Sequence, residues 1–284
     1  MSTSDKQDGS VGIVAGGGVL PAAVAHALEA RGRRPVLLAI RGYCDQATVS
    51  GRVHHWIALG QFGRLMRLLR QEGCHEVVSV GSLIRPALSE LRLDWQTVRL
   101  LPALVGAFRG GDDHLLTGIA RIFEGKGFRL LGIGDIAPEL TVPEGPLTRR
   151  KPDAACERDI AKGRAVLAAM SPFDVGQAAA VIDGHVVAIE DIEGTDALLG
   201  RVARLRAEGR IRAQEGRGVL VKAPKVGQDL RFDMPALGPA TVDGVAKARL
   251  GGIAVVAGQT LLAEAEGVVT AADRAGIFVV GLSA

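Results

Sequence analysis

Apolar strands alternate with amphipathic helices along the first half of the chain, and this alternation constrains the fold more than any other feature. Apolar runs with the length of buried strands lie at 10–16, 35–40, 53–59, 77–80 and 128–133. Segments with helical spacing of their apolar residues lie between them, at 21–32, 62–71, 88–108 and 114–124. Strands that alternate with helices pair in parallel through right-handed crossovers. The pattern therefore predicts a Rossmann-like N-terminal domain over 11–138, after a disordered N-terminus at 1–10.

A proline-rich stretch separates this half from the second. Residues 138–152 contain four prolines and few apolar residues, without helical or strand periodicity. We therefore expect a linker at 139–152 and a second domain over 153–284. A chain of 284 residues is long enough for two domains.

The second half mixes strands and helices in a less regular order. Apolar strand-like runs lie at 178–182, 185–189, 218–222, 253–256, 261 and 278–282. Helical segments lie at 156–170, 197–207, 241–250 and 268–275. The Asp183-Gly184 pair between two strands predicts a hairpin, since both central turn residues need positive φ. This half is expected to form a mixed α/β catalytic domain.

The composition excludes several classes of protein. With 48% hydrophobic residues and a net charge of +3 the chain is globular, and its one tyrosine, two tryptophans and seven phenylalanines are too few for a base-stacking platform. No nucleic-acid partner is expected. The three cysteines are far apart, which argues against a disulfide scaffold or zinc site, and no segment resembles a signal peptide or a membrane span. We expect a cytoplasmic protein.

A glycine turn after the first strand is the first candidate site. Gly16, Gly17 and Gly18, with Leu20 beyond them, precede a helix whose amides can face a phosphate. As a dinucleotide fingerprint the turn is defective, because Pro21 replaces the third glycine and the next strand lacks an acid for a ribose. A purely structural turn is an equally good interpretation.

Two acidic segments stand at predicted helix starts. Asp112 and Asp113 exceed what a helix cap needs, so one of them is available to a metal, a substrate hydroxyl or a water. Thr195 or Asp196 would cap the helix at 197–207, while Glu193 lies near the end of a strand, where ligand sites of α/β folds collect.

The most densely charged loop of the second half is the richest candidate. It holds three cations suited to phosphate oxygens, Lys222, Lys225 and Arg231. It also holds Asp229 and Asp233, oxygen donors of the kind that magnesium prefers. A surface charge network is the alternative.

A run of arginines follows the acidic segment of the second half. Its members are Arg201, Arg204, Arg206, Arg210, Arg212 and Arg217. A solvated helix and loop is the plain interpretation, and peripheral docking on an anionic membrane is the alternative.

Motifs spread over nearly the whole chain resemble those of one family, the UDP-2,3-diacylglucosamine pyrophosphatases of the LpxI type. They are AGGGVLP at 15–21, LGQFGRL at 59–65, GSLIRP at 81–86, GDD at 111–113, DVGQ at 174–177, EGTDAL at 193–198 and KAPKVGQDLRFDMPALG at 222–238. Two positions depart from the pattern that we expect of this family, Asp191 and Val226.

The resemblance implies an activity and its site. It implies hydrolysis of UDP-2,3-diacylglucosamine to UMP and 2,3-diacylglucosamine 1-phosphate (lipid X) in lipid A biosynthesis, with a divalent metal such as Mg²⁺ and a ligand held between the two domains. The aspartate of an R-x-D-x-P motif, Asp233, would be catalytic and hold the metal. Arg85 of GSLIRP joins the substrate-binding residues, and Gln228 or Asp229 would orient the phosphates. Glu193 or Asp196 would be the base or a second metal ligand.

Two other functions stay open at this point. An NADP-dependent oxidoreductase is favoured only by Arg41, which follows the second strand. A non-catalytic lipid-binding protein would use the same residues without turnover. For an enzyme the expected partner is the acylated UDP-sugar lipid, and a homodimer is compatible with the sequence.

Overall fold

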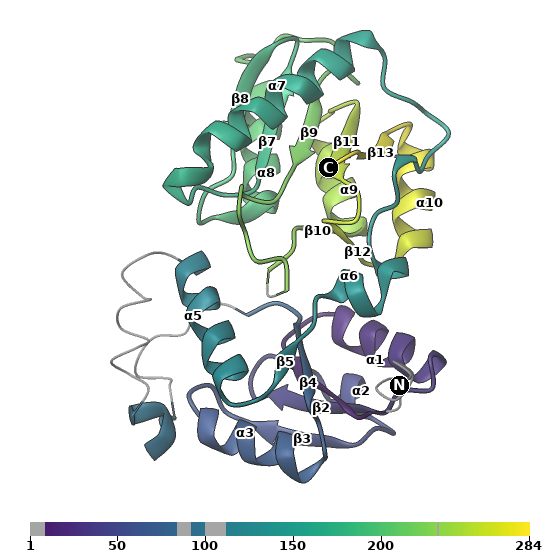
Figure 1. Cartoon of the computed structure of the whole chain (residues 1–284). Coiled ribbons are helices and arrows are strands. Elements are labelled where there is room, and N and C mark those ends of the chain that lie inside the picture. Colours follow the sequence, from purple (N-terminus) through teal and green to yellow (C-terminus); the bar gives the residue numbers. More distant parts are fainter. Residues whose placement is uncertain (1–8, 84–91, 100–111, 232) are drawn as a thin grey trace, which may run out of the picture. The chain divides into compact units, whose positions relative to one another are not determined.

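The chain forms two units, each with its own sheet and helices (Figure 1). The computed structural model describes residues 9–83, 92–99, 112–231 and 233–284, with only the backbone described at 112–117. The division into units falls between Met1–Pro138 and Glu139–Ala284. The predicted fold class, a parallel-sheet α/β domain followed by a mixed α/β domain, is confirmed.

The first unit is a parallel sheet with helices between its strands. The strand order is β3-β2-β1-β4-β5, and all neighbours run parallel. This order, with the first strand at the centre, is typical of a Rossmann-like sheet. The elements are β1 (Val11–Ala15), α1 (Leu20–Ala30), β2 (Pro35–Ile40), α2 (Gln46–Val49), β3 (His54–Ile57), α3 (Phe62–Gln71), β4 (Glu76–Val80), α5 (Asp112–Gly125), β5 (Arg129–Leu130) and α6 (Ile133–Ile136).

The central strands of the first unit are buried on both faces. Every residue of β2 is buried, which explains why its sequence, PVLLAI, is continuously apolar instead of alternating. On α1, Val24 and Leu28 are both fully buried, because residues four apart share one face of a helix. The sheet therefore forms a rigid base for the loops at its carboxyl edge.

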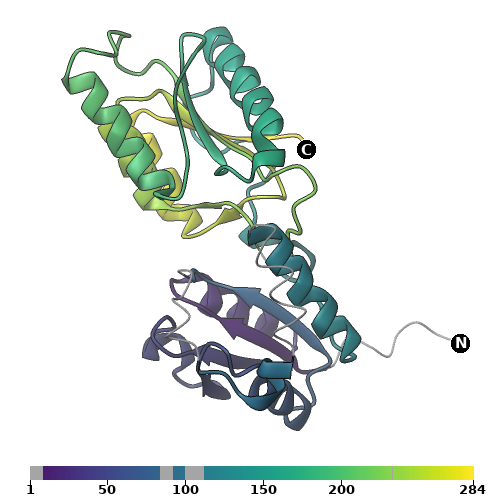
Figure 2. The same ribbon diagram turned by 90° about the vertical axis from the view of Figure 1, so that its left-hand side faces the viewer.

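The second unit contains a six-stranded mixed sheet and a small parallel pair, β10 with β12. Figure 2 shows the same unit turned by 90°. The elements are η2 (Pro138–Leu140), β6 (Gly145–Pro146), α7 (Ala154–Met170), η3 (Ser171–Phe173), β7 (Ala178–Ile182), β8 (His185–Ile189), α8 (Gly194–Ala207), β9 (Val219–Lys222), β10 (Ala236–Leu237), α9 (Pro239–Lys247), β11 (Gly252–Val256), β12 (Leu261–Leu262), α10 (Ala265–Ala275) and β13 (Phe278–Leu282).

The order of the large sheet decides which loops meet. It is β6-β13-β11-β9-β7-β8, with β7 antiparallel to both β9 and β8. Strands β8 and β9 therefore end at the edge where β7 begins. Along that edge Lys222 pairs with Ala178, and Ile189 pairs with Ala179.

Residues 139–152, where we expected a linker, pack onto the second unit. Val142 is fully buried, and β6 pairs antiparallel with β13. Thr148 accepts a hydrogen bond through Oγ1 from the backbone of Val279 at 2.9 Å. A short edge strand tolerates proline, because its outer amide needs no sheet partner. This is why a proline-rich segment can still be part of a sheet.

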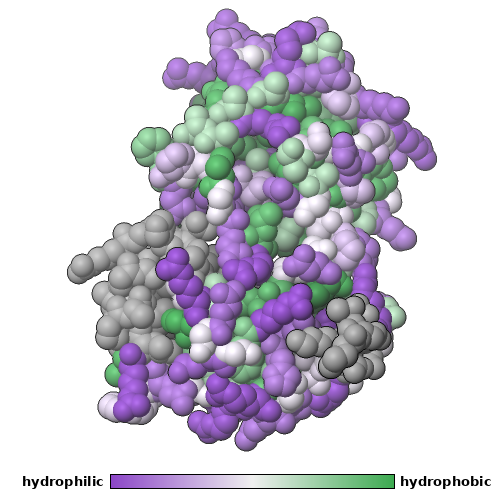
Figure 3. All heavy atoms as spheres, in the orientation of Figure 1, coloured by the Kyte–Doolittle hydropathy of each residue, from purple (hydrophilic) through white to green (hydrophobic). Residues whose placement is uncertain are grey.

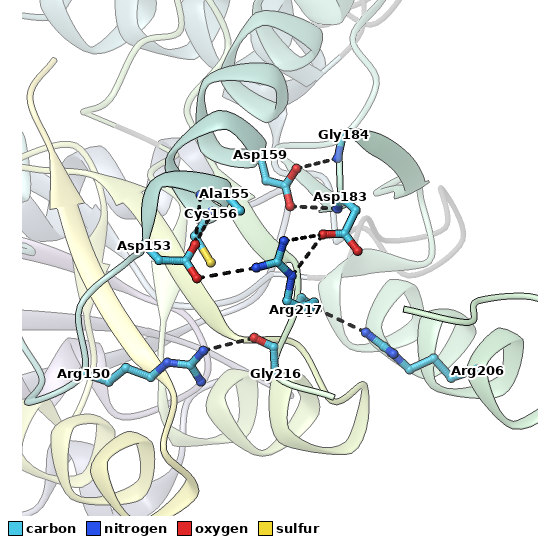
Figure 4. Close-up of polar contacts among 10 residues, drawn as sticks. All are labelled: Arg150, Asp153, Ala155, Cys156, Asp159, Asp183, Gly184, Arg206, Gly216 and Arg217. Carbon is cyan, nitrogen blue, oxygen red and sulfur yellow. Dashed lines mark hydrogen bonds and ion pairs between the residues drawn. The ribbon is translucent and has the colours of Figure 1, made fainter. Parts of the chain in front are cut away.

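The predicted Asp-Gly hairpin is confirmed, and a buried carboxylate accepts hydrogen bonds from the backbone of its turn (Figure 4). Asp183 and Gly184 have φ of 48° and 77°. Asp159 of α7, 2% exposed, accepts hydrogen bonds from their two amides at 3.0 and 2.7 Å. Arg217 pairs with Asp183 at 2.7 Å and with Asp153 at 3.5 Å. This cluster lies at the opposite edge of the sheet from Lys222.

Two expectations from the sequence differ from the structure or fall outside it. The strand expected at 128–133 is only β5, because Gly132 starts helix α6 and its amide donates to Asp135 Oδ2 at 3.1 Å. The helix expected at 88–108 lies largely outside the described residues.

Candidate functional site

Polar side chains from four segments meet at the edge of the large sheet where β8 and β9 end. Lys222 is the last residue of β9, Glu190 directly follows β8, and Gln177 directly precedes β7. Thr195 lies in the first turn of α8. The side chains of Lys222, Thr195 and Glu190 form one hydrogen-bonded group. Glu190 also accepts from the backbone N of Gln177, whose side chain donates to Asp233 in the loop after β9.

Lys222 is buried within this group. It is 7% exposed, and its Nζ donates to Thr195 Oγ1 and to the carbonyl of Ala236, both at 3.0 Å. Burial lowers the pKa of Lys222, and the nearby carboxylates of Glu190, Asp196 and Asp233 oppose that effect. The amine is therefore hydrogen-bonded inside the unit, and its contact with a substrate phosphate stays a prediction.

Glu190 connects the buried amine to the start of β7. Its Oε1 accepts from the hydroxyl of Thr195, and its Oε2 accepts from the backbone N of Gln177 at 2.7 Å. A Cβ on Gly176 would lie 2.7 Å from the Cβ and Cγ of Glu190. Only a glycine at 176 lets the two segments approach this closely.

Asp233 is an exposed carboxylate held by two side-chain amides. Its Oδ2 accepts from Gln177 Nε2 at 3.0 Å and from Gln228 Nε2 at 2.7 Å. The amide of Gln228 also donates to the backbone carbonyl of Asp233 at 3.2 Å. Two donors on one oxygen hold the carboxylate in one direction.

The remaining charges of the loop form ion pairs inside the unit. Lys225 pairs with Asp174. Arg231 forms a bidentate ion pair with Asp229, in which Nε lies 2.9 Å from Oδ1 and Nη2 lies 2.7 Å from Oδ2. The hydrogen bond from Arg231 holds the pKa of Asp229 below its usual value. Phosphate oxygens that reach these cations would therefore share them with carboxylates.

A pocket adjoins the loop in the described part of the second unit. It has a volume of about 330 Å³, and its lining includes Lys225 and Gln228 from the loop, Arg164 from α7 and Gln259 from the segment after β11. Gln228 lines the pocket and also donates to the Asp233 carboxylate, so one side chain connects the two.

The acids after β8 have different surroundings from those expected. Glu193 pairs with Arg201 at 3.0 Å, and Thr195 contacts Glu190 and Lys222 instead of capping α8. Asp196, in the first turn of the same helix, contributes to the electrostatic surroundings of Lys222. The sequence did not single out Glu190 or Gln177 as site residues. It placed both next to expected strand ends, but it did not predict the pairing of β7 with β9 that brings them to Lys222.

The glycine turn of the first unit has a steric explanation. Gly16 N donates to Val80 O and Gly17 N donates to Ser82 O, both at 2.9 Å. A Cβ on Gly16 would lie 2.7 Å from Ser82 O, and one on Gly81 would lie 2.7 Å from Gly17 O. The amides of Gly16 and Gly17 are thus used within the sheet edge, while phosphate contact at Gly18 and Leu20 stays a prediction.

Three other predicted residues cannot be placed at the site. Arg85 lies outside the described residues. Asp112 and Asp113 begin α5, but their side chains are outside the described part of the structure.

The described residues contain no group of three or more His, Cys, Asp or Glu side chains placed to hold a metal ion. Magnesium often binds through one or two carboxylates and completes its shell with water and substrate phosphates. An exposed, oriented carboxylate such as Asp233 fits a site of that type. A closed metal site built from protein ligands alone does not fit the described residues.

The fold and this edge define a two-domain α/β protein with an oriented carboxylate beside a buried lysine. The first domain matches the family model described as the LpxI N-terminal domain over residues 10–140, and the second matches the LpxI C-terminal domain over 143–280. A relative from Caulobacter vibrioides, named UDP-2,3-diacylglucosamine pyrophosphatase LpxI, is 39% identical over 272 residues, which cover 96% of this chain and 97% of the relative. The chain belongs to the LpxI family.

Proposed function

We propose that the protein hydrolyses the diphosphate of UDP-2,3-diacylglucosamine, releasing UMP and 2,3-diacylglucosamine 1-phosphate with the help of a divalent metal ion. Similarity over nearly the full length of a curated pyrophosphatase supports the reaction. Family membership favours this hydrolase over the oxidoreductase alternative.

The observation that carries the proposal is the orientation of Asp233. Two amides hold one carboxylate oxygen, so the side chain keeps its direction before the substrate arrives. When bound, a divalent ion would neutralise phosphate charge and activate water. Asp233 would hold that ion, with Gln177 and Gln228 maintaining the carboxylate.

Charges around the carboxylate would bind the diphosphate. Lys225 and Arg231 lie in the same loop, and each pairs with a carboxylate of the unit. A diphosphate offers both side chains stronger acceptors, because it carries more negative charge than a single carboxylate. Glu193 or Asp196 remains our proposal for the base, although the pairing of Glu193 with Arg201 means that it must release that arginine first.

Apolar side chains near the site would contact the acyl chains. Phe173, Ile192 and Val226 are 76%, 106% and 75% exposed. Phe173 directly precedes Asp174 and Val226 directly follows Lys225, and these two charged residues form an ion pair. Figure 3 shows apolar residues reaching the surface of the second unit between hydrophilic ones. Exposed apolar side chains beside a polar site suit a substrate that is part lipid and part nucleotide.

Membrane docking has less support than it had from the sequence. Arg201 pairs with Glu193, Arg206 donates to the carbonyls of Ala213 and Arg217, and Arg217 itself binds Asp183. Arg204 also pairs with Glu208, and Arg212 donates to the carbonyl of Gly209, so five of the six arginines have partners within the unit. Within the described residues, no helix combines the length and apolar character needed to cross a bilayer. Peripheral contact and a homodimer stay proposals.

The experiment that tests the function is an assay of UMP release from the acylated UDP-sugar, with and without a chelator. Metal-dependent release supports the proposal. Tight binding of the lipid without any release, at several metal concentrations, would favour the non-catalytic lipid-binding alternative.

A further inference from the structure

We infer that Glu190 is a positioning residue, which sets the direction of Asp233 through Gln177 and holds Lys222 in place through Thr195. The inference rests on the proposed function, because it assigns Asp233 a role in turnover. It starts from two hydrogen bonds of the Glu190 carboxylate, one from Thr195 and one from the backbone N of Gln177.

The first step is the burial of Lys222. A buried ammonium group is costly unless it is paired with an opposite charge. Lys222 Nζ donates to a hydroxyl and to a carbonyl, which carry no charge. Glu190 accepts a hydrogen bond from the same Thr195 hydroxyl. Of the carboxylates whose charge raises the pKa of Lys222 against the effect of burial, Glu190 has the largest effect.

The second step is the direction of the Thr195 hydroxyl. A hydroxyl has one proton to donate, and here the proton goes to Glu190 while an oxygen lone pair accepts from Lys222. The carboxylate at one end and the amine at the other therefore hold the hydroxyl in one orientation.

The third step leads from Glu190 to the exposed carboxylate. Glu190 Oε2 binds the backbone N of Gln177, and the close approach of Gly176 leaves this segment little room to shift. The side chain of Gln177 then donates to Asp233 Oδ2. Glu190 is thus two hydrogen bonds from the carboxylate that we place at the metal, without touching the substrate.

The test compares Glu190→Gln with Gln177→Ala and with the double variant. Glu190→Gln keeps the shape but removes the charge, and Gln177→Ala removes the side-chain amide but keeps the backbone N. Misplacement of a catalytic group by a fraction of an ångström is expected to lower kcat about tenfold in each variant, with KM nearly unchanged. Both changes affect kcat through the hydrogen bond from Gln177 Nε2 to Asp233. The double variant is therefore expected to lose about 10-fold to 20-fold in kcat, far from the roughly 100-fold of independent effects.

Two further variants complete the experiment. Glu190→Asp keeps the charge and is expected to recover part of the lost kcat. Glu208→Gln removes an exposed acid at the end of α8 and serves as a matched control with parental kcat. Multiplicative losses in the double variant, or parental kcat in Glu190→Gln, would overturn the inference. An inactive parent would instead refute the proposed function.

Discussion

Replacement of Asp159 by alanine is expected to destabilise the second unit without changing its activity. The carboxylate is 2% exposed and is the acceptor for the amides of Asp183 and Gly184. Each lost acceptor leaves a donor that costs about 1–3 kcal/mol when it stays dry. Asp183 is exposed, so water can recover part of this cost for one amide.

The net expectation is a loss of about 2 kcal/mol in the free energy of unfolding, close to the lower end of the sum for two donors. For a unit of this size that loss corresponds to a fall of about 4–8 °C in the melting temperature. Activity at 25 °C is expected to stay parental, because the hairpin turn lies at the opposite edge of the sheet from Lys222.

A melting curve followed by circular dichroism, together with a UMP-release assay, measures both quantities. Asp183→Asn is the matched control. It removes the partner of Arg217 but keeps a residue that tolerates positive φ, and exposed ion pairs contribute only about 0–1 kcal/mol. An unchanged melting temperature for Asp159→Ala, or a larger fall for the control, would refute this explanation of the hairpin.

Three further outcomes follow from the site and the first unit. Excess chelator is expected to stop UMP release, and added Mg²⁺ to restore it; full turnover in chelator would remove the metal from the mechanism. A UDP-sugar without acyl chains is expected to have a kcat/KM at least about tenfold lower than the acylated substrate, since apolar contacts worth more than about 1.4 kcal/mol are lost; equal values would leave the exposed apolar side chains without a role. Gly16→Ala is expected to destabilise the first unit by about 1–3 kcal/mol, because the new Cβ would meet Ser82 O at 2.7 Å; a melting temperature equal to that of the parent would show that the turn relaxes freely.

The sequence predicted the elements with long apolar runs well. β2 and the β7–β8 hairpin have the bounds expected from the apolar pattern and the Asp-Gly turn. The pattern failed where hydrogen bonding, not hydrophobicity, shapes the chain. β6 has two residues and no apolar signal of its own, so its pairing with β13 could not be foreseen.

The residues of the candidate site were also predicted only in part, because some of them come together only through strand pairing. The charged loop and Asp233 stood out by composition, and the structure joins them to Thr195. Glu190 and Gln177 acquire a role only through the antiparallel pairing of β7 with β9, a contact between distant parts of the sequence. The burial of Lys222 was also hidden, because a lysine at the end of a strand is usually exposed.

The most direct test of the account is the kcat of Asp233→Ala for UMP release, measured beside its melting curve. Loss of an oriented carboxylate that acts in the transition state is expected to lower kcat by about 100-fold or more, which is roughly 2.7 kcal/mol of barrier. The exposed position predicts a stability change of only about 0.5 kcal/mol, so the variant should melt like the parent and still bind the acylated UDP-sugar. A folded variant with near-parental kcat would contradict the central claim that Asp233 carries the reaction.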